Sequence, residues 1–270
     1  MNDTSDNTDR TTTSGSTVDR IAAVLAALGA DDDRTELHAS DIARMLGRER
    51  TQISRMLKKL SSTGLVEQNT ETRAYRLGWQ ICALASKAGD QRLLAAGRPV
   101  LRSLVIETKE SALLSVLQGD RSFTVLRERS PHTLRAGGWV GRTSPLHVTA
   151  SGRALLLDRT DDEVGELTAE GLHSGSHGPK EMTSLPAILR RLHDERAKGY
   201  TVAVEELEEG LVAIGAPVRD PSNRIVAAIN ISGPTNRMLH NLSSLSIATR
   251  TAATRLSGHP AQRPTALPTN

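Results

Sequence analysis

Three short segments with helical periodicity follow one another between residues 17 and 64, each ending at a glycine. Their apolar residues recur three and four positions apart, so that each segment has one apolar face. These residues are Val18, Ile21, Val24, Leu25 and Leu28, then Ile42, Ala43 and Leu46, then Ile53, Met56, Leu57 and Leu60. Two strand-like runs follow at 65–67 and 75–77, with polar residues between them. Three short helices and a hairpin predict a winged helix-turn-helix domain over residues 17–78.

The third segment carries most of the residues that we expect to contact DNA. With Ile53 and Leu57 packed inward, its other side chains face outward, as in a recognition helix that enters the major groove. Arg, Lys, Thr, Ser and Gln supply hydrogen-bonding groups that meet base edges and phosphates. The expected contacts are Arg50, Thr51, Gln52, Ser54, Arg55 and Lys58, joined by Arg44 of the second segment and by Arg73 and Arg76 of the hairpin. Lys58 and the three outlying arginines are expected to hold mainly phosphates.

Positive charge is concentrated around the same segment. The whole chain has 34 Lys and Arg against 31 Asp and Glu, a net charge of +3 that by itself does not indicate a nucleic-acid partner. Residues 44–59 contain six Lys and Arg side chains opposed by Glu49 alone. Such a stripe supplies the sequence-independent part of DNA affinity by releasing counterions from phosphates. Aromatic residues make up only 2% of the chain, which argues against a surface that stacks many bases.

Helical and strand-like patterns are mixed in the rest of the chain, which predicts an α+β fold. A linker helix is expected at 79–95, followed by a second domain at 96–257. Gly119-Asp120 is a hairpin signal between two of its expected strands. The expected helices of this domain are 100–107, 150–157, 184–198 and 239–256, and the expected strands are 111–118, 123–127, 202–204, 211–218 and 225–232.

The two ends of the chain differ from the rest in composition. Residues 1–16 are nearly all Thr, Ser, Asp, Asn and Gly, and residues 258–270 contain three prolines, so both are expected to be disordered tails. The single cysteine, Cys82, excludes a disulfide framework and a cysteine-based zinc finger, and we expect it to be a small buried residue. A cytoplasmic protein without a membrane partner is expected, because neither a signal segment nor a membrane-spanning run is evident.

An enzyme is the rival class. Ser151-Gly152 lacks the Gly-x-Ser-x-Gly context, and we find neither an HExxH motif nor a phosphate-binding glycine loop. His173 and His177 have a spacing that suits a metal, but their Gly/Ser-rich surroundings and the lack of an evident third ligand favour a solvated loop. Glu205, Glu206 and the glutamates that follow are expected to form a solvated acidic face. We therefore predict no cofactor and no enzymatic activity, with an enzyme that uses the C-terminal domain as the alternative.

Several motifs, in the same order along the chain, resemble the IclR family of bacterial transcriptional regulators. In the N-terminal part they are residues 41–47 (DIARMLG), 51–57 (TQISRML), 64–66 (GLV) and 75–78 (YRLG). In the C-terminal part they are 145–154 (PLHVTASGRA), 199–200 (GY), 205–206 (EE), 216–218 (APV) and 231–234 (ISGP), with Gly210 between them. The resemblance implies a winged helix-turn-helix, a linker helix and a GAF-like domain that binds a small organic effector.

The same resemblance implies how such a protein works. It implies a homodimer or a dimer of dimers, bound to a palindromic site in double-stranded operator DNA. It also implies a ligand-responsive regulator of genes for small-molecule catabolism or metabolism. A repressor is the expected role, and an activator of the same architecture is the alternative.

The effector-binding positions of the family can be carried over to this sequence. Several members hold small carboxylates through two backbone amides, which correspond to Ala150 and Ser151, and through polar side chains. The side-chain positions correspond to Ala203, Ala213, Asn230 and Ser232. Because two of these four are alanines, we expect a larger effector, aromatic or acyl, with one polar end. The residues expected to add an apolar wall are Leu134, Trp139, Val140 and Leu146.

Overall fold

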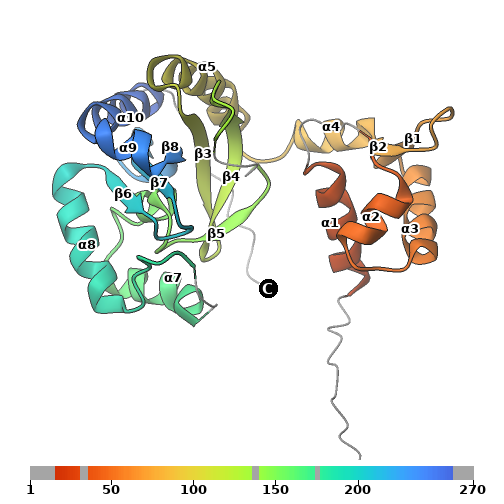
Figure 1. Ribbon diagram of the computed structural model, residues 1–270, viewed down its shortest axis with the longest axis horizontal. Helices are drawn as coiled ribbons and strands as arrows, with labels where there is room; N and C mark the ends of the chain where they lie inside the picture. The colour runs from red at the N-terminus through yellow and green to blue at the C-terminus, as the bar shows by residue number, and fades with distance from the viewer. Residues whose placement is uncertain (1–15, 31–35, 136–139, 174–176, 258–270) are drawn as a thin grey trace, which may run out of the picture. The chain divides into compact units, whose positions relative to one another are not determined.

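The computed structural model describes residues 16–30, 36–135, 140–173 and 177–257 (Figure 1). The chain divides after Ser86 into two compact units, and each is treated by itself below. The predicted tails lie outside the described residues except for Ser16, where the expectation of disorder was wrong. Its hydroxyl accepts the N–H of Asp19 at 3.2 Å and the Asp19 carboxylate accepts the N–H of Ser16 at 2.8 Å, a capping box that begins the first helix.

The N-terminal unit has the predicted winged helix-turn-helix arrangement. Its helices are α1 (Thr17–Leu28), α2 (Ala39–Met45), α3 (Arg50–Ser62) and α4 (Trp79–Ala85), and its hairpin consists of β1 (Val66–Gln68) and β2 (Tyr75–Leu77). Gly47 and Gly64 follow α2 and α3 with φ angles of 59° and 74°, a left-handed conformation that glycine adopts without steric cost. The core is formed by apolar side chains of all three leading helices and the hairpin, including Val24, Ile42 and Leu57.

The predicted single linker helix is in fact two helices, one in each unit. α4 ends at Ala85, and α5 (Gln91–Thr108) begins only after Asp90. The break has a local cause: Gly89 has a φ of 62°, and the Asp90 carboxylate accepts the first N–H groups of α5, which is how a helix begins. α5 also runs through Pro99, where a boundary was predicted. The expectation for Cys82 was wrong as well, because it is exposed on α4, whose seven described residues include no buried side chain.

The C-terminal unit is built around a six-stranded antiparallel sheet with the order β5-β4-β3-β8-β7-β6. The strands are β3 (Ser111–Gln118), β4 (Arg121–Glu128), β5 (Thr143–Pro145), β6 (Thr201–Val204), β7 (Leu211–Arg219) and β8 (Ile225–Pro234). The helices that follow α5 are α6 (Ala150–Leu155), α7 (Asp161–His173), α8 (Leu185–Lys198), α9 (Thr235–His240) and α10 (Leu242–Ser257). β5 and α7 were not predicted, and the predicted helix 239–256 is divided between α9 and α10.

Helices cover both faces of this sheet, as Figure 1 shows. α5 and α10 pack on one face, where they meet Val212 and Ile214 of β7 in the larger core cluster. α6 packs on the other face, and α7 and α8 complete a second cluster around it. α6 lies very close to β7: a Cβ on Gly215 would stand 2.6 Å from the Ala150 carbonyl oxygen. Only glycine permits this approach, which places the start of α6 directly over the sheet.

Candidate DNA-binding surface and effector pocket

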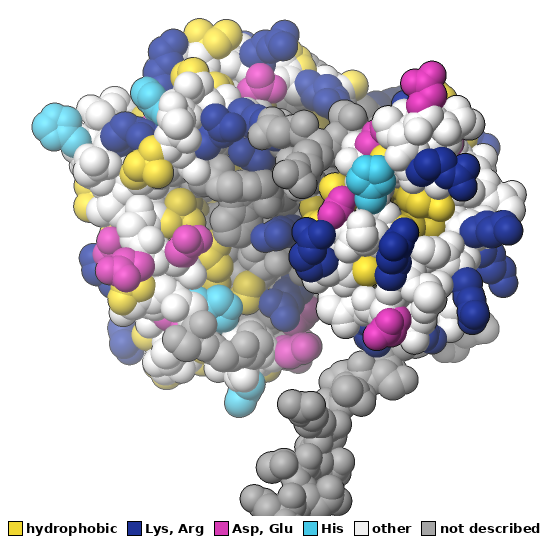
Figure 2. Space-filling model, turned by 45° about the vertical axis from the view of Figure 1, so that its right-hand side comes forward, with side chains coloured by type: hydrophobic (Ala, Val, Ile, Leu, Met, Phe, Trp, Pro, Cys, Tyr) yellow, Lys and Arg dark blue, Asp and Glu magenta, His cyan; other side chains and the backbone are white. Residues whose placement is uncertain are grey.

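α3 presents the predicted recognition surface. Ile53, Leu57 and Leu60 are buried against the other helices of the unit. On the opposite side of the helix lie Thr51, Arg55 and Lys58, and all three are exposed. The remaining predicted DNA contacts are also exposed, except that Ser54 is half-buried. Figure 2 shows Lys and Arg side chains spread over the face of the N-terminal unit, at right, that is turned to the viewer.

The predicted contacts are not equally available to DNA. Arg44 forms an ion pair with Asp41 at 3.1 Å, and Arg76 forms one with Glu67 at 3.0 Å across the hairpin. A phosphate must compete with these carboxylates. Arg73 stands in the turn of the hairpin with a φ of 59°, and its backbone N–H donates to the Asn69 carbonyl oxygen.

A cavity of about 50 Å³ lies between α6 and the sheet of the C-terminal unit. Each of the six strands contributes to its wall, together with the first residues of α6 and the segments that precede α6 and follow β6. Six of the ten predicted effector-binding residues line it, namely Ala150, Ser151, Ala203, Ala213, Asn230 and Ser232. The structure therefore brings together, around one cavity, the amide and side-chain positions carried over from the family.

The predicted apolar wall is not part of this cavity. Leu134 and Val140 are 68% and 53% exposed, respectively. Leu146 is buried elsewhere, in the cluster that α6 forms with α7 and α8. Trp139 lies outside the described residues. The apolar part of the lining comes instead from Leu113, Val148, Leu207 and Leu211 together with the three alanines.

Hydroxyl groups that the sequence interpretation missed form another part of the wall. Ser122 and Thr124 are buried on β4, and Ser144 stands beside them on β5. The Ser122 hydroxyl lies 3.2 Å from that of Ser151, at the start of α6. The missed signal was alternation: on β4, Ser122 and Thr124 stand two residues apart and are both buried. A register shift against β3 follows them, and Leu126 belongs to the core cluster on the other face of the sheet.

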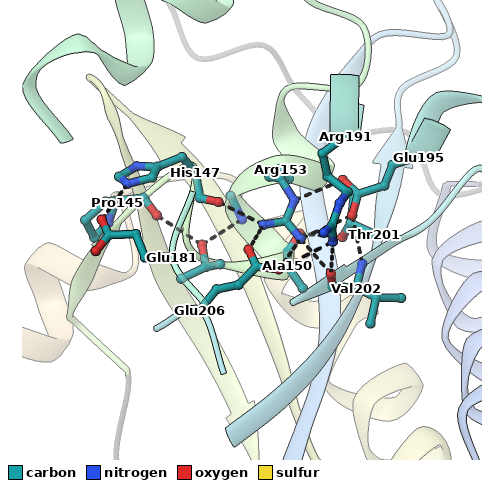
Figure 3. A network of polar contacts seen from close by, with 12 residues as sticks. Pro145, His147, Ala150, Arg153, Glu181, Arg191, Glu195, Thr201, Val202 and Glu206 are labelled. Atoms are coloured by element: carbon teal, nitrogen blue, oxygen red, sulfur yellow. Dashed lines mark hydrogen bonds and ion pairs between the residues drawn. The ribbon is translucent and has the colours of Figure 1, made fainter. Parts of the chain in front are cut away.

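A buried network of charges adjoins the cavity, and Figure 3 shows it around Arg153. The Arg153 side chain is fully buried and forms a two-pronged ion pair with Glu195, at 2.9 and 3.1 Å. It also pairs with Glu206 and donates to the carbonyl oxygens of His147 at 2.8 Å and Val202 at 2.7 Å. The expectation that Glu206 belongs to a solvated acidic face was wrong, because it is 3% exposed and lines the cavity.

The electrostatics of this network determine the charge at the wall of the cavity. Burial raises the pKa of the Glu206 carboxyl, against the opposing effect of the Arg153 guanidinium. Burial alone would lower the pKa of the Arg153 guanidinium. The carboxylates of Glu195 and Glu206 more than offset this effect and hold the pKa above its ordinary value. Arg191 approaches Glu206 to 3.5 Å, so two cations balance two anions. Glu206 is the one charged side chain among the described residues that line the cavity.

The two histidines singled out in the sequence have different surroundings. His173 is the last residue of α7, where its Nδ1 lies 2.6 Å from the Ala169 carbonyl oxygen. His177 is not in a solvated loop: its side chain is 18% exposed and its Nδ1 lies 3.0 Å from Glu181 Oε1. His147 lies on the other side of the same carboxylate oxygen. His177 is therefore grouped with Glu181 and His147 rather than with His173. Sequence spacing did not reveal this group, because His147 is 34 positions away from Glu181.

These features define a DNA-binding protein that has a separate domain with a ligand cavity. Residues 17–70 match the family described as "IclR helix-turn-helix domain", and residues 86–258 match the one described as "Bacterial transcriptional regulator IclR C-terminal". The chain belongs to the IclR family of bacterial transcriptional regulators. The fold class and regulatory function predicted from its sequence are thus confirmed. Among its described residues, no helix is long and apolar enough to span a membrane.

Named relatives and solved structures agree with this assignment. The HTH-type transcriptional regulator KdgR of Escherichia coli (strain K12) is 30% identical over 230 residues, 85% of this chain and 86% of the relative. The HTH-type transcriptional repressor AllR of Salmonella typhimurium is 29% identical over 201 residues, 74% of this chain and 73% of the relative. The fold is shared with an IclR homologue from Microbacterium hydrocarbonoxydans complexed with 4-hydroxybenzoate, with a TM-score of 0.71, 23% identity and coverage of 90% of this chain and 98% of the other.

Proposed function

We propose that this protein is a transcriptional repressor that binds a palindromic operator and is released by a small organic effector. The observation that carries the proposal is the pairing of an exposed basic recognition helix with a small cavity, lined by hydrogen-bonding groups, in a separate domain. The similarity to the repressor AllR supports repression over activation. Such a protein acts in the cytoplasm, where the DNA is, and requires no catalytic chemistry or cofactor.

The proposed contacts with DNA are ordered by exposure and charge. Thr51 and Arg55 stand opposite the buried face of α3 and would read base edges, with Arg50, Gln52 and Ser54 beside them. Lys58, Arg44, Arg73 and Arg76 would hold phosphates.

A symmetric dimer fits this function, because two half-sites require two recognition helices. α4 supports such pairing. Trp79 is 76% exposed and Leu84 is 54% exposed on it, which leaves an apolar helix surface without a partner in the described single chain. Whether one dimer or a pair of dimers binds the operator is decided by sedimentation of the protein with and without DNA.

The cavity supports a different effector from the aromatic or acyl one expected from the sequence. Its volume is about 50 Å³. An engineered cavity that takes up benzene is much larger, at about 150 Å³. Eight of its fifteen lining residues are polar: Ser122, Thr124, Ser144, Thr149, Ser151, Glu206, Asn230 and Ser232. We therefore propose a compact effector of a few carbon atoms that carries several hydrogen-bonding groups.

An aromatic acid is the second candidate. The homologue complexed with 4-hydroxybenzoate supports it, although that likeness is one of fold. In this chain such a ligand requires the cavity to widen. A carboxylate of either effector would be met by hydroxyl groups and by the first N–H groups of α6. Among these, the N–H of Gly152 already donates to the Thr149 hydroxyl.

Fluorescence anisotropy tests the proposal directly. The purified protein is titrated onto the DNA upstream of its own gene and onto scrambled DNA across a salt series, and two- to four-carbon hydroxy and oxo acids are then compared with 4-hydroxybenzoate. Selective binding that one of these compounds weakens supports the regulator and identifies the effector class. Equal, weak and salt-sensitive binding to both DNAs, with no compound bound in calorimetry, contradicts it.

A further inference from the structure

Three side chains from two distant segments converge on one point outside the effector cavity. His147 lies between β5 and α6, while His177 and Glu181 lie between α7 and α8. Glu181 Oε1 stands 3.1 Å from His147 Nε2 and 3.0 Å from His177 Nδ1, and the three atoms all lie within 4.8 Å of one another. Figure 3 shows the Glu181 carboxylate turned toward the His147 ring. The convergence brings together two imidazoles and one carboxylate.

The local structure holds these groups in place. The backbone N–H of His177 donates to Glu181 Oε2 at 2.8 Å, which leaves Oε1 directed between the two imidazoles. His147 is fully buried, and a Cβ on Gly171 of α7 would stand only 3.1 Å from its Nδ1, so α7 fixes the position of the ring. The two imidazole planes stand at 87° to each other. Ligands fixed by their surroundings in this way are what a metal site requires.

The distances suit a transition metal ion. In a tetrahedral zinc site each nitrogen or oxygen lies about 2.1 Å from the ion, which sets neighbouring ligand atoms about 3.4 Å apart. The two separations measured from Glu181 Oε1 are a few tenths of an ångström shorter than this. An ion can therefore enter once the side chains move to place the two imidazole nitrogens, which lie within 4.8 Å of each other, at a similar separation. Two imidazoles favour zinc over calcium or magnesium, which prefer oxygen ligands.

We propose that His147, His177 and Glu181 bind one zinc ion, with a water molecule in the fourth position. The site ties the segment that carries His177 and Glu181 to the residues that precede α6. It is separate from the effector cavity, whose described lining includes none of the three.

The geometry also connects this site to the effector cavity. The His147 carbonyl oxygen accepts a hydrogen bond from Arg153, which pairs with Glu206 of the cavity wall. In addition, the backbone N–H groups of Gly178 and Lys180 donate to the carbonyl oxygens of Glu206 and Glu205 at 2.9 and 3.1 Å. Zinc would fix this segment against the wall and so tighten effector binding. This second step rests on the proposed function, and by linkage the effector would tighten zinc binding equally.

Zinc titration of the full-length, tag-free and metal-stripped protein tests the site without DNA or effector. Competition with a chromophoric chelator measures affinity, and visible absorption of Co²⁺ in place of Zn²⁺ reports tetrahedral coordination. We expect one ion per chain, and binding weakened about tenfold or more in both His177→Ala and Glu181→Gln. His173→Ala, a change at the last residue of α7 and four residues from His177, is the matched control and should bind zinc as the natural protein does.

Three outcomes would overturn the site: no stoichiometric binding, undiminished affinity in both variants, or equal loss in His173→Ala. Circular dichroism of each metal-free variant identifies a change that acts through misfolding. Because Glu181→Gln preserves shape, it remains informative if His177→Ala unfolds. Effector affinity with and without zinc tests the second step alone, so that failure of the proposed function leaves the zinc measurement intact.

Discussion

Arg153 and Glu206 form an ion pair in which both side chains are buried, and the carboxylate of that pair is also part of the effector cavity. Two functions thus meet in one contact. Arg153 joins α6 to α8 through Glu195, and through Glu206 it sets the charge at the wall of the proposed effector cavity. The pair is therefore important both for the stability of the C-terminal unit and for its ligand.

Arg153→Met should destabilise the C-terminal unit by about 3–5 kcal/mol, because it leaves the buried carboxylates of Glu195 and Glu206 with only Arg191 nearby. Urea unfolding followed by circular dichroism measures the change. The matched control is Arg159→Met, which removes a partly exposed pair with Glu163 and should cost less than about 1 kcal/mol. Similar losses in the two variants would show that Arg153 contributes no more than a surface arginine.

Arg55→Ala should weaken operator binding by at least about 1 kcal/mol, since Arg55 is exposed opposite the buried face of α3. Anisotropy on operator and scrambled DNA measures the loss and assigns it to base or phosphate contacts. Arg102→Ala, an exposed change on α5 of the other unit, serves as the control. Unchanged operator affinity in Arg55→Ala would remove this residue from the proposed surface.

Ala213→Leu should abolish the effector response while leaving operator binding intact. The added side chain occupies the cavity of about 50 Å³, at a stability cost of about 1–3 kcal/mol from overpacking. Calorimetry with the effector found in the DNA assay measures the loss. Ala197→Leu on the exposed side of α8 is the control. Normal effector affinity in Ala213→Leu would place the ligand elsewhere.

Asp220 should stabilise the protein only above acidic pH. Hydrogen bonds from the backbone and side chain of Arg224 hold the pKa of this carboxyl below its ordinary value of 3.8. Because the folded state binds this proton less readily than the unfolded state, the stabilisation is complete above about pH 5 and is lost as the pH falls through the folded pKa. Unfolding of the natural protein and of Asp220→Asn across pH 3–7 should give curves that converge on acidification. A constant difference would contradict the assignment.

Local features of the fold could be predicted from the sequence, whereas distant pairings could not. Gly47, Gly64 and Gly199 end helices through their own backbone conformation, so their effect is visible in a short window. α7 was missed because Gly165 and Gly171 interrupt its apolar pattern. β5 was missed because a strand of three residues is too short to show the alternation of buried and exposed side chains. Asp90, which caps α5, was likewise placed inside the predicted linker helix.

In the candidate site, too, local features could be predicted from the sequence and distant pairings could not. Six cavity residues could be placed because the resemblance to the family carried their positions over to this sequence. The pairing of Arg153 with Glu206 joins residues 53 positions apart, and nothing in either neighbourhood indicates the other. A hint was nonetheless present, because Arg153 stands among small and apolar residues of α6 where a charge requires a buried partner.

The close approach of α6 to Gly215 means that some positions of this domain tolerate substitution and others do not. The backbone of α6 rests on that of β7, so the position of its first residues does not depend on the side chains that line the cavity. In the proposed effector cavity, substitutions at positions such as Ala203 and Ala213 can therefore change the effector one residue at a time. A side chain at Gly215 would displace α6 and remove the response to every effector at once.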